Sequence, residues 1–160
     1  MKFLHVMDPI ERIDITKDTS FVFIREAQLR GHQNFYCGIA DLAFQDGRVV
    51  VRSAPLRVTD VQGSHAEVGE WSWRPAEEFA CVFMRKDPPF DLAYITTTHL
   101  LERIHPKTLV VNDPASVRNA PEKMFVTEFP ELMPPTLLTR DLAEIKAFRA
   151  QHGDIVMKPL

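Results

Sequence analysis

The sequence predicts an α/β fold: an open, mostly parallel β-sheet flanked by helices, with a β-hairpin insertion. Three observations support this prediction. Short apolar runs of strand character alternate with helix-like segments, an order typical of parallel sheets. Three of these runs are followed within a few residues by an Asp-Pro pair. An Asp-Gly pair also separates two further strand-like runs, which indicates a hairpin.

The first strand, helix and strand follow each other directly. Residues 2–7 form a short apolar run, and residues 18–20 (DTS) supply N-cap candidates for a helix predicted over 21–30. Gly31 ends this helix, and residues 34–39 are again strand-like. Because two strands joined by a helix normally pair in parallel with a right-handed crossover, we expect a βαβ unit here.

Residues 41–53 predict the hairpin, with Asp46 and Gly47 at its turn. The polar segment that follows carries Trp71 and Trp73. Packing onto the body of a domain is the commoner use of tryptophan, although exposed indoles would also suit a partner surface.

A central strand predicted over 79–84 leads into the most unusual stretch of the chain, residues 84–91, with the sequence MRKDPPFD. Neither proline can donate to a sheet ladder, so the strand must end in a stiff, extended loop. The charged residues from Arg85 onward would then lie at the carboxyl end of a strand, where open α/β sheets bind ligands. The alternative is an ordinary polar connection, with Asp91 as the next N-cap.

An amphipathic helix is predicted over 91–103, and a buried strand over 108–111. The predicted buried face of the helix consists of Leu92, Ile95, Leu100, Leu101 and Ile104. Three strands therefore lead into Asp-Pro pairs, which begin at Asp8, Asp87 and Asp113. We expect these pairs to build one ligand-binding edge of the sheet.

We divide the chain into an N-terminal domain, 1–120, and the truncated beginning of a second domain, 121–160. In the second part, strands are predicted over 136–139 and 154–158, and a helix with a capping-box start over 141–151. Because a last strand without a neighbour would expose an unpaired edge, we expect disorder near the end of the chain or contact with a neighbouring chain.

Composition and motifs limit the function classes. The chain has 160 residues, 45% of them hydrophobic, and a formal net charge of -3 with interspersed charges, which disfavours nucleic-acid and membrane partners. No signal peptide or membrane span is evident, so we expect a cytoplasmic protein, with Cys37 and Cys81 as free buried thiols. No glycine-rich nucleotide loop, nucleophile elbow or Cys-x-x-Cys motif is present, and the histidines lack metal-site spacing.

Six short motifs resemble a known family in order and spacing. They are MDPI at 7–10, KDTSF at 17–21, MRKDPPFD at 84–91, EK at 122–123, PPT at 134–136 and KPL at 158–160. Together they resemble the prokaryotic glutathione synthetase family of the ATP-grasp superfamily. The resemblance implies a Rossmann-like pre-ATP-grasp domain, which helps to bind substrate, followed here by only the opening of an ATP-grasp domain.

The resemblance also implies an activity for the full-length protein. Such ligases use ATP and Mg²⁺ to activate γ-glutamylcysteine as an acyl phosphate, which glycine then attacks, and bacterial members are often homo-oligomers. No bound cofactor is expected on this chain alone. Three alternatives stay open, of which the first two are an ATP-grasp ligase for another carboxylate and amine, and a free-standing flavodoxin-like domain that binds a small molecule. A structural module built on the tryptophans is a third.

Four residues receive roles from the matched motifs. Arg85 matches a substrate-binding position, where its planar guanidinium suits a carboxylate of γ-glutamylcysteine, and Asp8 lies nearby in a supporting part. Lys123 and Lys158 match positions that contact the phosphates of ATP. No catalytic or metal-binding residue is expected in this chain, because the family's glycine-rich loop and magnesium ligands follow later.

Overall fold

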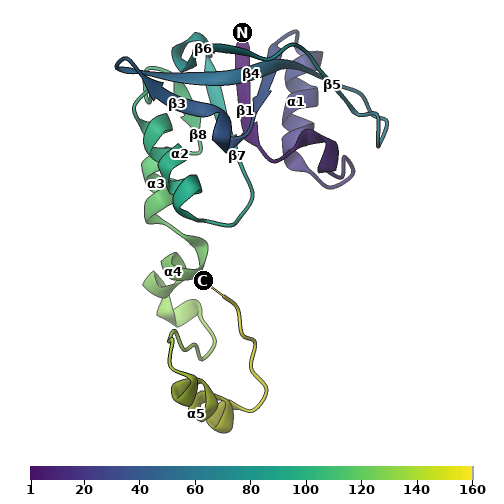
Figure 1. Cartoon of the computed structure of the whole chain (residues 1–160). Helices are drawn as coiled ribbons and strands as arrows, with labels where there is room; N and C mark the ends of the chain where they lie inside the picture. Colours follow the sequence, from purple (N-terminus) through teal and green to yellow (C-terminus); the bar gives the residue numbers. More distant parts are fainter. Residues whose placement is uncertain (160) are drawn as a thin grey trace. The chain divides into compact units, whose positions relative to one another are not determined.

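The structure is a computed structural model that describes residues 1–159, except for the side chain of Glu122. The chain divides into two compact units, Met1–Asn119 and Ala120–Leu160, each of which is described by itself (Figure 1).

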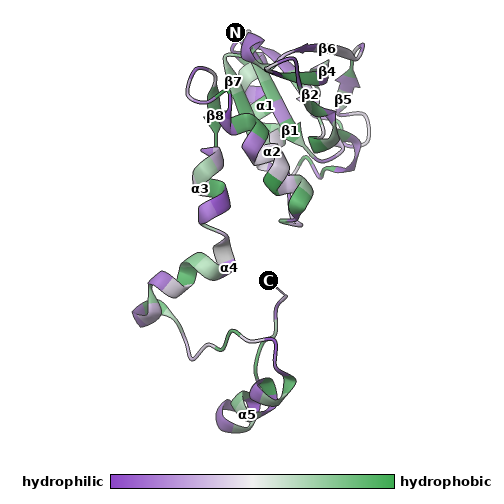
Figure 2. Ribbon diagram, turned by 60° about the vertical axis from the view of Figure 1, so that its left-hand side comes forward, coloured by the Kyte–Doolittle hydropathy of each residue, from purple (hydrophilic) through white to green (hydrophobic). Residues whose placement is uncertain are grey.

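Four parallel strands form the centre of the first unit. They are β1 (Lys2–Met7), β2 (Gln33–Cys37), β7 (Cys81–Arg85) and β8 (Leu109–Val111), in the spatial order β2-β1-β7-β8. This arrangement confirms the predicted α/β class and the parallel pairing of the first two strands. Figure 2 shows hydrophobic residues along β7 and β8, as is typical of parallel strands, although Leu109 of the edge strand β8 is 52% exposed.

Antiparallel strands extend this sheet beyond β2. The long strand β4 (Arg48–Val58) pairs with β2, and it also pairs with β3 (Leu42–Gln45), β5 (Ala66–Val68) and β6 (Ser72–Pro75). The hairpin between β3 and β4 is confirmed. Both of its turn residues have a left-handed backbone, with φ of 49° at Asp46 and 82° at Gly47, as a tight hairpin turn requires.

The two tryptophans differ in their environment. Trp71 packs against the core, and its ring meets that of Tyr36 edge to face with centroids 5.6 Å apart. Trp73 on β6 is 57% exposed. The expected packing onto the body of the domain therefore holds for Trp71 and not for Trp73.

Alternation along β1 divides the core between the two faces of the sheet. Leu4 and Val6 point into a cluster with Leu101 of α2 (Leu92–Glu102), whereas Met7 lies in a cluster with Ile24 of α1 (Thr19–Leu29). In Figure 1 these two helices lie on opposite sides of β1. Both faces of the central strand are thus buried, which fixes its register.

The first helix is capped by Asp18, one of its three N-cap candidates, and the second by Asp91, the cap named in the alternative interpretation of the loop. The side chain of Asp18 accepts a hydrogen bond from the Phe21 amide (2.9 Å), and Asp91 accepts one from the Tyr94 amide (2.9 Å). The predicted buried face of α2 is partly wrong, because Leu92 is 78% exposed while Thr97 and Thr98 are buried. Their hydroxyls donate to carbonyls one helical turn back, so burial leaves them satisfied.

The remaining helical segments are short. They are α3 (Pro114–Asn119), α4 (Glu122–Phe125) and the 3-10 turns Ile10–Arg12, Ile39–Asp41, Ala76–Glu78, Val126–Glu128 and Pro130–Leu132. None of the helices in the described part of the chain combines the length and the apolar character that a bilayer span needs.

The second unit contains α4 and α5 (Leu142–His152) and, up to residue 159, no strand. The strands predicted over 136–139 and 154–158 are therefore wrong. A strand needs a hydrogen-bonded neighbour, and neither segment finds one here. Several large apolar side chains of the unit are also exposed, among them Leu132, Leu142, Val156 and Met157.

The start of α5 also differs from the predicted capping box. Asp141 caps the helix by accepting from the Ala143 amide (2.7 Å). Its own amide donates to the hydroxyl of Thr139 (3.0 Å), which takes the place expected for Glu144. Gly153 ends the helix with φ of 79°, as predicted.

Both cysteines are free and buried, as expected. Burial raises the pKa of the Cys81 thiol to about 11 and that of Cys37 well above its usual value. Neither thiol is therefore a nucleophile near neutral pH.

A buried histidine lies in the middle of β1. His5 is fully buried, its Nε2 lies 3.0 Å from Asn34 Oδ1, and its ring stacks on Phe83. The amide nitrogen of Asn34 donates to the carbonyl of Ile24 (2.9 Å), so its oxygen accepts from His5 Nε2. Among the described residues nothing bonds to Nδ1. Burial lowers the pKa of His5 from 6.5 to about 4, opposed by the bond to Asn34.

We predict that acid destabilises this unit through His5. Because its pKa is lower in the folded state, the unfolded chain takes up the proton first as pH falls below 6.5. The free energy of unfolding should drop by about 2 kcal/mol between pH 7 and pH 5 from this residue alone. Urea unfolding at both pH values measures the drop. Position 5 of the His5→Phe variant cannot titrate, so the unfolding free energy of this variant should drop by about 2 kcal/mol less than that of the wild type over the same pH range. Equal drops in the two proteins would contradict the prediction.

Candidate functional site

The candidate site lies where the strand order reverses. From β1 the chain passes through α1 to β2 on one side, and from β7 it passes through α2 to β8 on the other. Neighbouring loops therefore diverge at the carboxyl ends of β1 and β7, and this is the position where open α/β sheets form their binding crevice. Met7 pairs with Arg85 in the ladder between the two strands, so Asp8 and Arg85 reach the same edge.

Arg85 is held from one side by the first turn of α1. Its Nε donates to Ser20 Oγ (3.1 Å), and its Nη2 donates to Thr19 Oγ1 (2.6 Å). The guanidinium also lies over the ring of Phe23, 5.7 Å from its centroid. No carboxylate among the described side chains forms an ion pair with Arg85, so neutral groups hold a full positive charge at this edge.

Asp8 fastens the loop that follows β7. One carboxylate oxygen lies 3.0 Å from Lys86 Nζ, and the other accepts from the Asp87 amide (3.1 Å). Lys86 Nζ also donates to the Asp87 carbonyl (2.5 Å), and its side chain is only 14% exposed. Lys86 and Asp87, whose roles the sequence left open, thus shape the loop together with Asp8. We call these three residues the loop latch.

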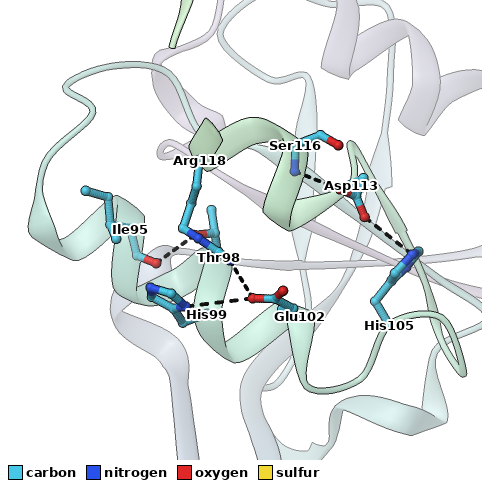
Figure 3. A network of polar contacts seen from close by, with 8 residues as sticks. All are labelled: Ile95, Thr98, His99, Glu102, His105, Asp113, Ser116 and Arg118. Atoms are coloured by element: carbon cyan, nitrogen blue, oxygen red, sulfur yellow. Dashed lines mark hydrogen bonds and ion pairs between the residues drawn. The ribbon is translucent and has the colours of Figure 1, made fainter. Parts of the chain in front are cut away.

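The third Asp-Pro pair follows β8, the parallel neighbour of β7, and so lies at the same edge of the sheet. Its carboxylate, however, caps α3 by accepting from the Ser116 amide (2.7 Å). Hydrogen bonding to the Ser116 hydroxyl, and next to the Ser116 amide, lowers the pKa of Asp113. His105 Nε2 lies 3.5 Å from the other oxygen of Asp113 (Figure 3). The carboxylate thus has a structural task at this end of the edge.

The same region holds α3 against α2. Arg118 Nη2 lies 2.6 Å from Glu102 Oε2, and its Nη1 donates to the hydroxyl of Thr98 (3.4 Å). His99 approaches the same carboxylate at 3.8 Å (Figure 3). Since each of these groups pairs with another side chain of the network, the network fastens the last helix of the first unit.

The second unit contains a cavity of about 940 Å³ that Lys158 lines. Its other walls combine apolar residues, such as Phe148 and Ile155, with the cation of Arg140 and the carboxylate of Asp154. The apolar residues and the two cations are of the types that bind a nucleotide, because the base needs apolar contact and the phosphates need positive charge. Lys123 lies on α4 and is not among the described residues that line this cavity.

No group of three or more metal-binding side chains occurs within the described residues. We therefore assign no magnesium ligand to them.

Comparison with known proteins agrees with this geometry. Residues 1–118 match the family described as prokaryotic glutathione synthetase, N-terminal domain, and residues 122–160 match the ATP-grasp domain of the same family. The chain belongs to the prokaryotic glutathione synthetase family. The resemblance carried by the six motifs is thereby confirmed.

Curated members of the glutathione synthetase family are similar along the chain. A glutathione synthetase of Rhodopseudomonas palustris is 56% identical over 154 residues, which are 96% of this chain and 49% of the relative. One of Mesorhizobium japonicum is 54% identical over 160 residues, which are 100% of this chain and 51% of the relative. The chain thus spans about half the length of the curated relatives it matches.

We predict that the loop latch stabilises the fold and orders the loop. The Asp8→Ala variant should lose roughly 1 kcal/mol of unfolding free energy and Asp8→Asn about half of that, since asparagine can still accept from the Asp87 amide. The Asp87 amide should exchange faster in Asp8→Ala. Urea unfolding and amide hydrogen exchange measure both effects.

The matched control removes a carboxylate from a more exposed ion pair. Asp60 lies 2.9 Å from Arg25 Nε, and both side chains are about half exposed. Asp60→Asn should change stability by less than about 0.5 kcal/mol. Equal effects of Asp8→Ala and Asp60→Asn would show that the loop latch contributes no more than a surface pair.

Proposed function

We propose that this chain supplies the substrate-binding domain, and the beginning of the ATP-grasp domain, of a glutathione synthetase. The enzyme would join γ-glutamylcysteine and glycine with ATP. Family membership supports the reaction class. The observation that carries the assignment of the site is Arg85, a cation at the strand-order reversal that neutral hydroxyls hold without an acidic partner in the described chain.

Arg85 is suited to bind a carboxylate of γ-glutamylcysteine. A guanidinium paired with Asp or Glu would have to give up that partner before it could bind a substrate anion. Arg85 has no such competitor among the described side chains, and α1 begins beside it with its positive dipole end. A two-pronged hydrogen bond between guanidinium and carboxylate then adds direction to the attraction.

Asp8 supports substrate binding through its contacts in the loop latch. Both of its carboxylate oxygens are engaged, one by Lys86 and one by the Asp87 amide. Asp8 would therefore act on the substrate indirectly, by keeping the start of the loop in place beside Arg85.

ATP, when bound, supplies the phosphoryl group that activates the carboxylate. Lys123 and Lys158 would contact its phosphates as point charges. For Lys158 this proposal is supported by its place in a cavity that also contains Arg140 and apolar walls. For Lys123 it rests on the match of residues 122–160 to the ATP-grasp domain. Mg²⁺ would accompany ATP in the full-length enzyme.

We further propose that the full-length protein is a cytoplasmic homo-oligomer with small-molecule substrates and without nucleic-acid or membrane partners. The net charge of -3, with both signs interspersed, supports the absence of polyanion partners.

We predict that γ-glutamylcysteine binding by this chain depends on Arg85. Arg85→Ala should weaken the affinity by about 10- to 100-fold, because a charge-assisted pair is lost. The affinity of Arg85→Lys should fall between those of Arg85→Ala and the wild type, because lysine keeps the positive charge but lacks the planar guanidinium. Isothermal titration measures the affinity. The control is Arg30→Ala, which removes an exposed arginine paired with Glu26. Unchanged binding by Arg85→Ala would overturn the proposed site.

We also predict that the 160-residue chain alone forms no glutathione. The phosphate contacts proposed here are only two lysines, and the glycine-rich loop and magnesium ligands that the resemblance implies are not among the residues assigned a role. Release of ADP from ATP in the presence of γ-glutamylcysteine and glycine measures turnover. Sustained ADP release by the purified chain, above a blank without glycine, would contradict this prediction.

A further inference from the structure

We propose that Thr19 and Ser20 form a hydroxyl clamp that positions Arg85, so that only one edge of its guanidinium is presented to the substrate carboxylate. Thr19 and Ser20 would be positioning residues, because they act through Arg85. The inference rests on the proposed function of Arg85 and names the residues on which its geometry depends.

The clamp occupies one edge of the guanidinium. Nε and Nη2 donate in the same direction, and their acceptors are the hydroxyls of Ser20 (3.1 Å) and Thr19 (2.6 Å). Ser20 is only 4% exposed, so its oxygen is fixed by the packing around α1. Phe23, one turn further along the helix, covers the guanidinium at 5.7 Å. Three residues of one helix thus determine where the guanidinium lies.

The opposite edge remains for a ligand. Nη1 and the second hydrogen of Nη2 form a second pair of parallel donors, and Nη1 has no hydrogen-bond partner in the described part of the chain. A carboxylate can accept both hydrogens end-on. Because an arginine loses much rotamer freedom when it binds, holding it in advance improves affinity.

The clamp is built from neutral groups, so it orients Arg85 without cancelling its positive charge. An Asp or Glu at position 19 or 20 would also orient Arg85, but it would cancel the positive charge that attracts the substrate. The two hydroxyls are available because Asp18, and not Thr19 or Ser20, caps α1. Orientation and capping are thus divided among three consecutive residues.

The experiment removes and restores the hydroxyls one at a time. Thr19→Val and Ser20→Ala remove them, while Thr19→Ser and Ser20→Thr keep them. The matched control is Ser116→Ala at the exposed start of α3, which removes a hydroxyl that interacts with Asp113 and not with Arg85. Two quantities are measured for each variant of the chain: the affinity for γ-glutamylcysteine, and the NMR signal of the Arg85 Nε–H, which is protected from exchange while it is hydrogen-bonded.

Each removal should weaken binding by about fivefold, and the two together by about 20-fold. Ser20→Ala should also abolish protection of the Arg85 Nε–H in the free chain. Thr19→Ser, Ser20→Thr and Ser116→Ala should stay within about twofold of the wild type. Thr19 is exposed, so Thr19→Val tests the clamp even if Ser20→Ala fails to fold.

Two outcomes distinguish the clamp from the function on which it rests. If Arg85→Ala loses binding while Thr19→Val keeps wild-type affinity, the clamp is wrong and the proposed site stands. If Arg85→Ala binds as well as the wild type, or the chain does not bind γ-glutamylcysteine, the proposed site fails and the clamp fails with it.

Discussion

Strand β1 lies between two parallel neighbours, and the chain leaves those neighbours in opposite directions. Its two faces are buried under different helices, so neither the register nor the direction of β1 can change without exposing one half of the core. The candidate site depends on this constraint. It brings the ends of β1 and β7 to one edge and places the first turn of α1 beside them.

The two adjacent cations at this edge, Arg85 and Lys86, have different kinds of partner. Lys86 is neutralised by Asp8 and nearly buried, which makes it part of the loop latch. Arg85 is oriented by hydroxyls and keeps its charge. Both residues are partly buried, and a partly buried charge can be held either by a counter-ion or by neutral hydrogen-bond acceptors. The difference between these neighbours separates a structural cation from a candidate binding cation.

The second unit shows what a strand requires. Residues 136–139 and 154–158 have strand-like composition, yet they lie in irregular backbone beside exposed apolar side chains. Strand propensity mainly reflects fit to a partly buried, paired surface. Without a hydrogen-bonded neighbour, the composition alone does not produce a strand.

Local chemistry in the sequence determined the caps at Asp18 and Asp91 and the hairpin turn at Asp46-Gly47, because each depends on a few consecutive residues. Tertiary structure decided the rest. Asp8 meets the Asp87 amide across 79 residues, and Arg85 meets Thr19 across 66. Asp8 and Asp113 look alike in the sequence, but one fastens a loop and the other caps a helix. Which oxygen meets which donor depends on strand order and register, which no local pattern contains.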